Sequence, residues 1–161
     1  QLFAYKSDIS KDYSNTSVLQ VVQTAKKVSR EKHRMEAFVR FRLTKDHLYF
    51  ASVSPDFNVL PLIKKHFTRR YSDQKWLIYD IKRKYGLYYD LKKTEMIQLE
   101  FPKSFDFSRT DKDYFTDQEL DFQDLWQNYF KSTNIASRKN LKLHTQHVPK
   151  RYWKYLSEKQ V

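Results

Sequence analysis

Three absences limit what this sequence can be. It contains no cysteine, which excludes a disulfide framework, a thiolate nucleophile and metal centres held by cysteine. A single glycine in 161 residues excludes the glycine-rich loops that bind phosphates in P-loop and dinucleotide-binding proteins. No run of about 18 apolar residues is present, and the N-terminus lacks a signal-peptide pattern. We therefore expect a cytoplasmic protein without membrane contact, holding no cofactor or metal of its own.

Negative charge is also scarce. The chain has 31 Lys and Arg against 19 Asp and Glu, a formal net charge of +12, which favours polyanionic partners through long-range attraction. The excess is steepest in residues 131–161, which hold eight Lys or Arg and one acidic residue, interleaved with Tyr152, Trp153 and Tyr155. Because cations attract phosphates and exposed aromatic rings stack on bases, nucleic acid is the first partner that the sequence indicates.

The length and an apolar content of 40% fit one domain with a substantial core. Apolar residues recur at helical spacing from Val18 to Met35, which predicts a first helix. Asn58 and Pro61 mark the start of a second helix that ends near Arg70. Residues 1–17 are expected to form an N-terminal flank, and a first residue of Gln is consistent with a chain whose N-terminal portion has been removed.

Five further segments are predicted to be strands, the first because apolar and basic residues alternate along it and the others because they are rich in aromatic and aliphatic residues and flank short polar or charged links. They are 38–43 paired with 48–53, 76–79 paired with 85–89, and 96–101. We therefore expect a single α+β domain over residues 18–161, with an antiparallel sheet built from two β-hairpins and helices packed on one face.

The C-terminal third is predicted to be helical after a loop. Residues 102–115 have no periodicity and are expected to form an internal linker or mobile loop. Thr116 and Glu119 form a capping box in front of an apolar helical stripe. A short helix is predicted over 135–144, and Pro149 can start a last helical segment.

Two groups of residues are predicted to contact nucleic acid. The first lies on the cationic side of the first helix and the solvent face of the first hairpin, and comprises Arg30, His33, Arg34, Arg40 and Arg42. The second lies in the basic C-terminal region, where cations neutralise phosphates and polar side chains donate to sugars or base edges. It comprises Arg138, Lys139, Asn140, Lys142, His144, His147, Lys150, Arg151 and Trp153. The alternative for both groups is a solvated surface that binds nothing.

A sparse nuclease signature is also present. Pro-Asp56 followed by Asp80-Ile-Lys82 spells a pattern in which two acids hold Mg²⁺ and the lysine assists attack on phosphate. Such nucleases place the two acids on adjacent strands, whereas a helix is predicted between Asp56 and Asp80. In the structural alternative, Asp56 flanks that helix and Asp80 lies at a hairpin turn. No other metal site is predicted, because the pair His144 and His147 lacks a third ligand.

Nine strings of the sequence carry a family resemblance. The longer ones are Lys27-Val-Ser-Arg-Glu-Lys-His-Arg-Met35, Pro55-Asp-Phe-Asn-Val-Leu-Pro61, Trp76-Leu-Ile-Tyr-Asp80, Trp126-Gln-Asn-Tyr-Phe130, Asn134-Ile-Ala-Ser-Arg138 and Pro149-Lys-Arg-Tyr-Trp-Lys-Tyr-Leu156. The shorter ones are Phe38-Val-Arg-Phe41, His66-Phe67 and Arg70-Tyr71. Together they resemble a bacterial family of uncharacterised domains labelled "probable DNA metabolism protein". The resemblance runs from about Val18 to Lys159, and residues 1–17 match nothing in that family.

The resemblance implies a role beside DNA repair enzymes. The family looks like the companion of a radical S-adenosylmethionine protein similar to spore photoproduct lyase, and in some relatives it is joined to a uracil-DNA-glycosylase-like domain. The iron–sulfur cluster would then belong to the partner, so the lack of cysteine here does not conflict with this role. The resemblance carries over no catalytic residue. Because its last string is a family signature, some of Tyr152, Trp153 and Tyr155 are expected to lock the C-terminal segment onto the domain.

Three functions follow as hypotheses. The first is a DNA-binding accessory protein that acts with a radical S-adenosylmethionine or glycosylase-like partner. The second is a metal-dependent nuclease or base-processing enzyme that uses Asp56, Asp80 and Lys82. The third is an interaction module that docks on the repair partner and touches no DNA.

Overall fold

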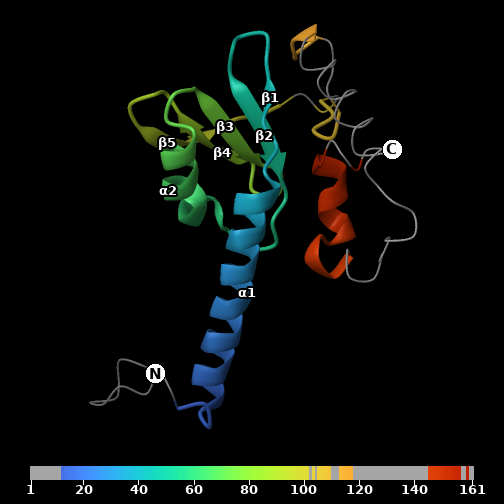
Figure 1. The fold of residues 1–161 in the computed structure, drawn as a ribbon. Coiled ribbons are helices and arrows are strands. Elements are labelled where there is room, and N and C mark those ends of the chain that lie inside the picture. Colours follow the sequence, from blue (N-terminus) through green and yellow to red (C-terminus); the bar gives the residue numbers. More distant parts are fainter. Residues whose placement is uncertain are drawn as a thin grey trace.

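The protein is an α+β domain, as predicted (Figure 1). The computed structural model describes residues 12–101, 103, 105–109, 113–117, 145–156 and 159. The elements are α1 (Thr16–Phe38), β1 (Arg42–Leu43), β2 (Tyr49–Val53), α2 (Leu60–Arg70), β3 (Trp76–Asp80), β4 (Tyr85–Tyr89), β5 (Thr94–Gln98) and the 3₁₀ helix η3 (Lys150–Tyr155). Among the described residues, no helix combines the length and the apolar composition that a membrane crossing requires.

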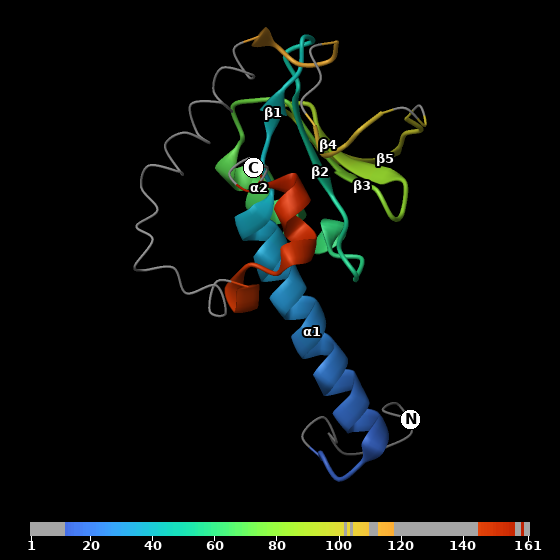
Figure 2. The same ribbon diagram turned by 90° about the vertical axis from the view of Figure 1, so that its right-hand side faces the viewer.

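Helix α1 is longer than predicted. It starts where the Asn15 side chain accepts hydrogen bonds from the backbone N–H groups of Ser17 and Val18, at 3.0 and 3.4 Å. It continues through Phe38, whose ring packs against Tyr152, so the strand expected at 38–43 shortens to the two residues of β1. The C-terminal half of α1 packs on the domain through the buried Met35, while the N-terminal half projects away from the sheet (Figures 1 and 2).

The sheet contains both predicted hairpins and one parallel pair. Strands follow one another in the order β1-β2-β3-β4-β5, and β1–β2, β3–β4 and β4–β5 are antiparallel. Strands β2 and β3 are parallel, because helix α2 carries the chain back to the edge from which β2 started. The sheet is therefore mixed where the sequence predicted antiparallel pairing throughout. In this register Val53 lies opposite Asp80, so the loops that follow β2 and β3 meet at one edge of the sheet.

Both faces of the sheet are covered. On one face, Ala51, Ile78 and Leu87 pack against α1, α2 and η3, which is the predicted layer of helices. On the other face, Phe50, Leu77 and Tyr79 pack against aromatic residues from the segment 99–115. Each of the five residues of β3 is accordingly buried.

The described residues of 102–115 contain no helix or strand, in agreement with the predicted loop. They are nevertheless part of the core rather than a free linker. Phe115 is 1% exposed, and Phe107 stacks on Tyr79 with ring centroids 5.3 Å apart. Large aromatic rings bury too much apolar surface to remain in water, which explains why a segment without periodicity packs on the sheet.

The final segment docks on the domain. Pro149 precedes the 3₁₀ helix η3, and both Tyr152 and Leu156 are 2% exposed. The expectation that aromatic residues lock this segment in place is confirmed for Tyr152. The helices predicted after Thr116 and over 135–144 lie outside the described residues, apart from the first positions of the former.

Candidate functional site

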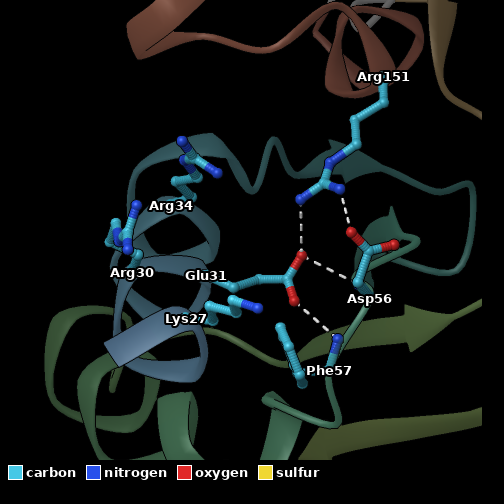
Figure 3. Close-up of a pocket in the computed structure, with 7 residues that line it drawn as sticks. All are labelled: Lys27, Arg30, Glu31, Arg34, Asp56, Phe57 and Arg151. Atoms are coloured by element: carbon cyan, nitrogen blue, oxygen red, sulfur yellow. Dashed lines mark hydrogen bonds and ion pairs between the residues drawn. The ribbon is translucent and has the colours of Figure 1, made fainter. Parts of the chain in front are cut away.

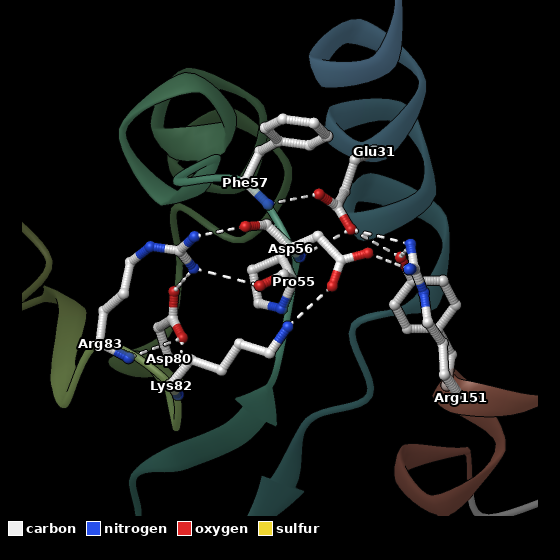
Figure 4. Close-up of polar contacts among 9 residues, drawn as sticks. Glu31, Pro55, Asp56, Phe57, Asp80, Lys82, Arg83 and Arg151 are labelled. Atoms are coloured by element: carbon white, nitrogen blue, oxygen red, sulfur yellow. Dashed lines mark hydrogen bonds and ion pairs between the residues drawn. The ribbon is translucent and has the colours of Figure 1, made fainter. Parts of the chain in front are cut away.

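A buried glutamate joins three segments that are distant in the sequence. Glu31 of α1 is 2% exposed, and its two carboxylate oxygens accept hydrogen bonds from the backbone N–H groups of Asp56 and Phe57, at 2.9 and 2.7 Å. The same side chain accepts from the Arg151 guanidinium at 3.1 Å (Figures 3 and 4). It also accepts from the Tyr152 hydroxyl at 2.8 Å. Helix α1, the loop after β2 and η3 therefore meet at one carboxylate.

Asp56 adds a second layer to this arrangement. Its side chain is 43% exposed, accepts from Lys82 Nζ at 2.7 Å and also pairs with Arg151. The hydrogen bond from Lys82 and the charge of Arg151 hold the pKa of Asp56 below its ordinary value, although partial burial opposes them. We call Glu31, Asp56, Lys82, Arg151 and Tyr152 the Glu31 network. Its two acids and two bases balance in charge, which is the condition for burying Glu31.

Tyr152 makes the network sensitive to alkaline pH. Burial and the hydrogen bond to Glu31 raise the pKa of Tyr152 to about 12, since a phenolate would lie beside a carboxylate in a dry site. The ordinary value in an unfolded chain is about 10. The folded state therefore holds its proton more tightly than the unfolded state between these two values.

We expect this difference to lower the stability of the protein by about 2 to 3 kcal/mol as the pH rises from about 10 to about 12. Stability from this group is fully present below the unfolded pKa and is lost as the pH approaches the folded one. Urea unfolding of the wild type and of Tyr152→Phe over this range isolates the effect, because the variant lacks the ionisable group. The stability advantage of the wild type over the variant should shrink as the pH rises and reverse near pH 12, and a constant difference would contradict the assignment.

Cations from α1 and η3 line a small pocket above this network. The pocket has a volume of about 210 Å³, and we call it the α1–η3 pocket. Its lining residues are Lys27, Arg30, Glu31, Arg34, Asp56, Phe57 and Arg151. Figure 3 shows Arg151 reaching toward Glu31 and Asp56 from the side opposite α1.

Three basic residues of α1 that line the pocket have no acidic partner among the described residues. Lys27, Arg30 and Arg34 recur at spacings of three and four, which places them along one side of the helix. None of these three forms an ion pair within the described part of the chain. The pocket therefore lies over the charge-balanced Glu31 network and adds three positive charges that no acidic side chain of the described residues compensates.

The structure brings together part of the predicted nucleic-acid surface. Arg30 and Arg34 from the first predicted group and Arg151 from the second line the same pocket. His33 on α1 is exposed, as are His147 and Lys150 near η3. The remaining members of the C-terminal group, Arg138, Lys139, Asn140, Lys142 and His144, lie outside the described residues.

Three residues predicted to contact nucleic acid make hydrogen bonds within the protein. Arg42 was expected on the solvent face of the first hairpin, but it is 9% exposed and donates to the backbone carbonyls of Arg109 and Phe107 at 2.6 and 3.1 Å. Its guanidinium also lies over the Phe115 ring, so Arg42 fixes the loop that covers the second sheet face and is withdrawn as a DNA contact. Arg40 folds back onto the carbonyl of Ala37, and the partly buried Trp153 donates to the carbonyl of Val148.

The parallel pairing of β2 and β3 also brings the three nuclease candidates close together (Figure 4). Lys82 contacts Asp56, but Asp80 is fully buried and accepts from the backbone N–H groups of Lys82 and Arg83 and from the Arg83 guanidinium. Arg83 donates as well to the carbonyls of Pro55 and Asp56, at 3.1 and 2.7 Å. Both oxygens of Asp80 are therefore occupied by protein donors. In the part of the chain that the structure describes, no group of three or more His, Asp or Glu side chains is arranged to hold a metal ion.

Sequence reasoning missed Glu31, Arg83 and Tyr152 as members of the site. Each of the three has partners that lie far along the chain, at separations that no local pattern covers. One signal was available: Glu31, Asp56 and Tyr152 each fall within one of the strings that carry the family resemblance. Strings that recur together are expected to meet in the fold.

Comparison with known proteins identifies the family and no function. No curated protein and no solved structure matches the chain at a significant level. One family model matches residues 1–158, which is nearly the whole chain, and its description is a domain of unknown function. The match agrees with the resemblance to an uncharacterised domain family and corrects its extent, because it includes residues 1–17, which the resemblance left out. The chain therefore belongs to the family of the domain of unknown function DUF4130.

Proposed function

We propose that the domain binds DNA through the basic residues of the α1–η3 pocket. The observation that carries the proposal is the meeting of Lys27, Arg30 and Arg34 with Arg151, because the fold brings cations from two distant segments to one pocket. The three cations of α1 repel one another, and an anion between them relieves that repulsion. Phosphate is the anion that suits a set dominated by arginine, since the guanidinium fork matches its geometry.

The pocket also favours binding over catalysis. Arg151 is held by Glu31 and Asp56, but 45% of its side chain remains exposed, so it can still face a ligand. The acids beneath it accept hydrogen bonds from protein donors, which fixes the position of the guanidinium before a ligand arrives. A preformed cation costs less conformational entropy on binding than a mobile one.

The biological role that we propose is an accessory to DNA repair in the cytoplasm. In this proposal the domain presents DNA to a partner that carries the chemistry, either a radical S-adenosylmethionine protein or a uracil-DNA-glycosylase-like domain. The resemblance described above supports this role. Co-purification of such a partner with the full chain, resistant to nuclease treatment and high salt, would show that the contact between the two proteins is direct.

We expect the double variant Arg30→Gln, Arg34→Gln to weaken binding to duplex DNA by about 10- to 100-fold at low salt. The slope of log K against log salt should fall by about two, because each lost phosphate contact removes a slope of about 0.9. Fluorescence anisotropy at salt concentrations from about 50 to about 200 mM measures both quantities.

The matched control removes two charges elsewhere. Lys45 and Lys92 lie exposed in the β1–β2 and β4–β5 turns, and Lys45→Gln, Lys92→Gln lowers the net charge equally. This control should keep the wild-type slope if the pocket binds DNA locally. Equal losses of DNA affinity in the two double variants would show that only the net charge matters and not the pocket. Absence of binding to any duplex or single strand at low salt would overturn the proposal.

A further inference from the structure

A second basic surface lies between α1 and α2. It is a cleft of about 610 Å³, and we call it the α1–α2 cleft. Its lining residues are Lys32, Glu36, Leu62, Lys65, His66, Arg69 and Arg70. Lys32 and Glu36 stand on a different side of α1 from Arg30 and Arg34, because successive residues of a helix are rotated by about 100°. The α1–α2 cleft and the α1–η3 pocket share no lining residue.

The charges in this cleft are poorly compensated. Helix α2 contains no acidic residue, and neither Lys65 nor Arg69 forms an ion pair within the described residues. Glu36 is the one carboxylate of the lining, and it is paired with Lys32 at 2.8 Å. The cleft therefore holds four permanent cations against one acid.

Helix stability explains only part of this set. Arg69 and Arg70 lie in the last turn of α2, where cations interact favourably with the helix dipole. Lys65 lies in the middle of the helix, four residues before Arg69, and like charges at this spacing repel. A cluster that weakens its own helix is better explained by a ligand than by folding.

The rest of the lining defines which anion fits. Leu62 is 48% exposed, and the His66 ring stands edge-on to Phe67 with centroids 5.0 Å apart. The side chains of Leu62 and His66 therefore form an apolar and aromatic wall beside the cations. The volume lies in the range of small-molecule sites and exceeds what a bare phosphate needs. A nucleotide combines both features, since its phosphate suits the cations and its base can lie against the wall.

We propose that the α1–α2 cleft binds a phosphate-bearing nucleotide unit, either as part of a single strand or as a free nucleotide. In its strand-bound form the proposal rests on the proposed function. A free nucleotide would occupy the cleft even if the α1–η3 pocket bound no DNA. The two sites would then hold separate phosphates on different sides of α1.

The test uses the full chain labelled with ¹⁵N and two probes, thymidine monophosphate and a 5′-phosphorylated oligothymidylate of about ten nucleotides. Amide resonances of Leu62, His66 and Arg69 should shift with at least one probe. Lys65→Ala, Arg69→Ala should weaken that probe's binding by about tenfold for each charge removed. Shifts with the mononucleotide identify a free nucleotide, and shifts with the oligonucleotide alone identify a strand. Unchanged resonances with both probes would overturn the proposal.

A second variant is expected to change the affinity in the opposite direction. Glu36→Gln removes the carboxylate that lines the cleft, so nucleotide affinity should rise by several-fold, about the effect of one exposed charge pair. The variant Arg30→Gln, Arg34→Gln should leave the shifts that thymidine monophosphate causes in the cleft unchanged, because the cleft and the α1–η3 pocket share no lining residue. If nucleotide affinity neither rises in Glu36→Gln nor falls in the double variant Lys65→Ala, Arg69→Ala, the charges of the cleft do not bind phosphate.

Discussion

Replacement of Glu31 by alanine is expected to lower the free energy of unfolding by about 3 to 5 kcal/mol, the cost of breaking a buried ion pair from one side. The reason is the number of groups that depend on this carboxylate. Without it, the N–H groups of Asp56 and Phe57 and the hydroxyl of Tyr152 lose their acceptor. Urea unfolding followed by tryptophan fluorescence measures the loss.

Two control variants separate the loss of the buried carboxylate from the loss of an exposed carboxylate and of a single hydroxyl group. Glu95→Ala removes an exposed carboxylate paired only with Lys93, so its stability should stay within about 0.5 kcal/mol of the wild type. Tyr152→Phe leaves the other partners of Glu31 in place and should cost about 1 to 2 kcal/mol at neutral pH. A Glu31→Ala protein as stable as Glu95→Ala would show that η3 and the loop after β2 are held without this carboxylate.

The second large effect is expected at Asp80, where alanine should cost about 3 kcal/mol. Asp80 closes the turn between β3 and β4 and pairs with Arg83, which also holds the loop after β2 through two carbonyl groups. Its loss therefore loosens two loops at once. Thermal unfolding should show the cost, and Asp80→Asn should recover part of it, because the amide oxygen still accepts from the turn.

Asp80 is also the residue at which a structural role can be distinguished from the role in metal binding that the nuclease hypothesis requires. We expect no Mg²⁺-dependent cleavage of DNA by the intact chain, because both oxygens of Asp80 accept from protein donors. Lys82→Ala is the sharper probe, since the Lys82 side chain is 47% exposed and its removal should spare the fold. Cleavage by the wild type that disappears in a stable Lys82→Ala protein would establish the enzyme hypothesis.

Local patterns were sufficient to predict most of the fold. Alternating residues located the first hairpin, because a strand with one face in the core repeats every two residues. The second was located by two apolar runs on either side of a charged link, and its strand β3 is buried along its whole length. The strand expected at 38–43 failed for a long-range reason: Phe38 packs against Tyr152, and this contact extends the helix. The parallel pairing of β2 and β3 was also beyond local pattern, because it depends on where α2 returns the chain.

The candidate site was less predictable than the fold. Charge spacing was sufficient to select Arg30 and Arg34, since an uncompensated helix side is visible in the sequence. The burial of Glu31 could not be predicted, because a glutamate between Arg30 and Lys32 has the pattern of a solvated surface. Arg42 was misassigned for the converse reason: its partners are backbone carbonyls of a loop more than sixty residues away, which no sequence pattern reveals.

The distance along the chain between Glu31 and Arg151 has a consequence for synthesis. These residues are 120 positions apart, so α1 leaves the ribosome long before η3. Until then Glu31 lacks Tyr152 and Arg151, and the α1–η3 pocket lacks its fourth cation. Contacts between such distant segments form late, because a long loop must close first. A nascent or truncated chain would therefore carry the positive charge of α1 without the assembled pocket, and under the proposed function it would bind DNA more weakly than the finished chain.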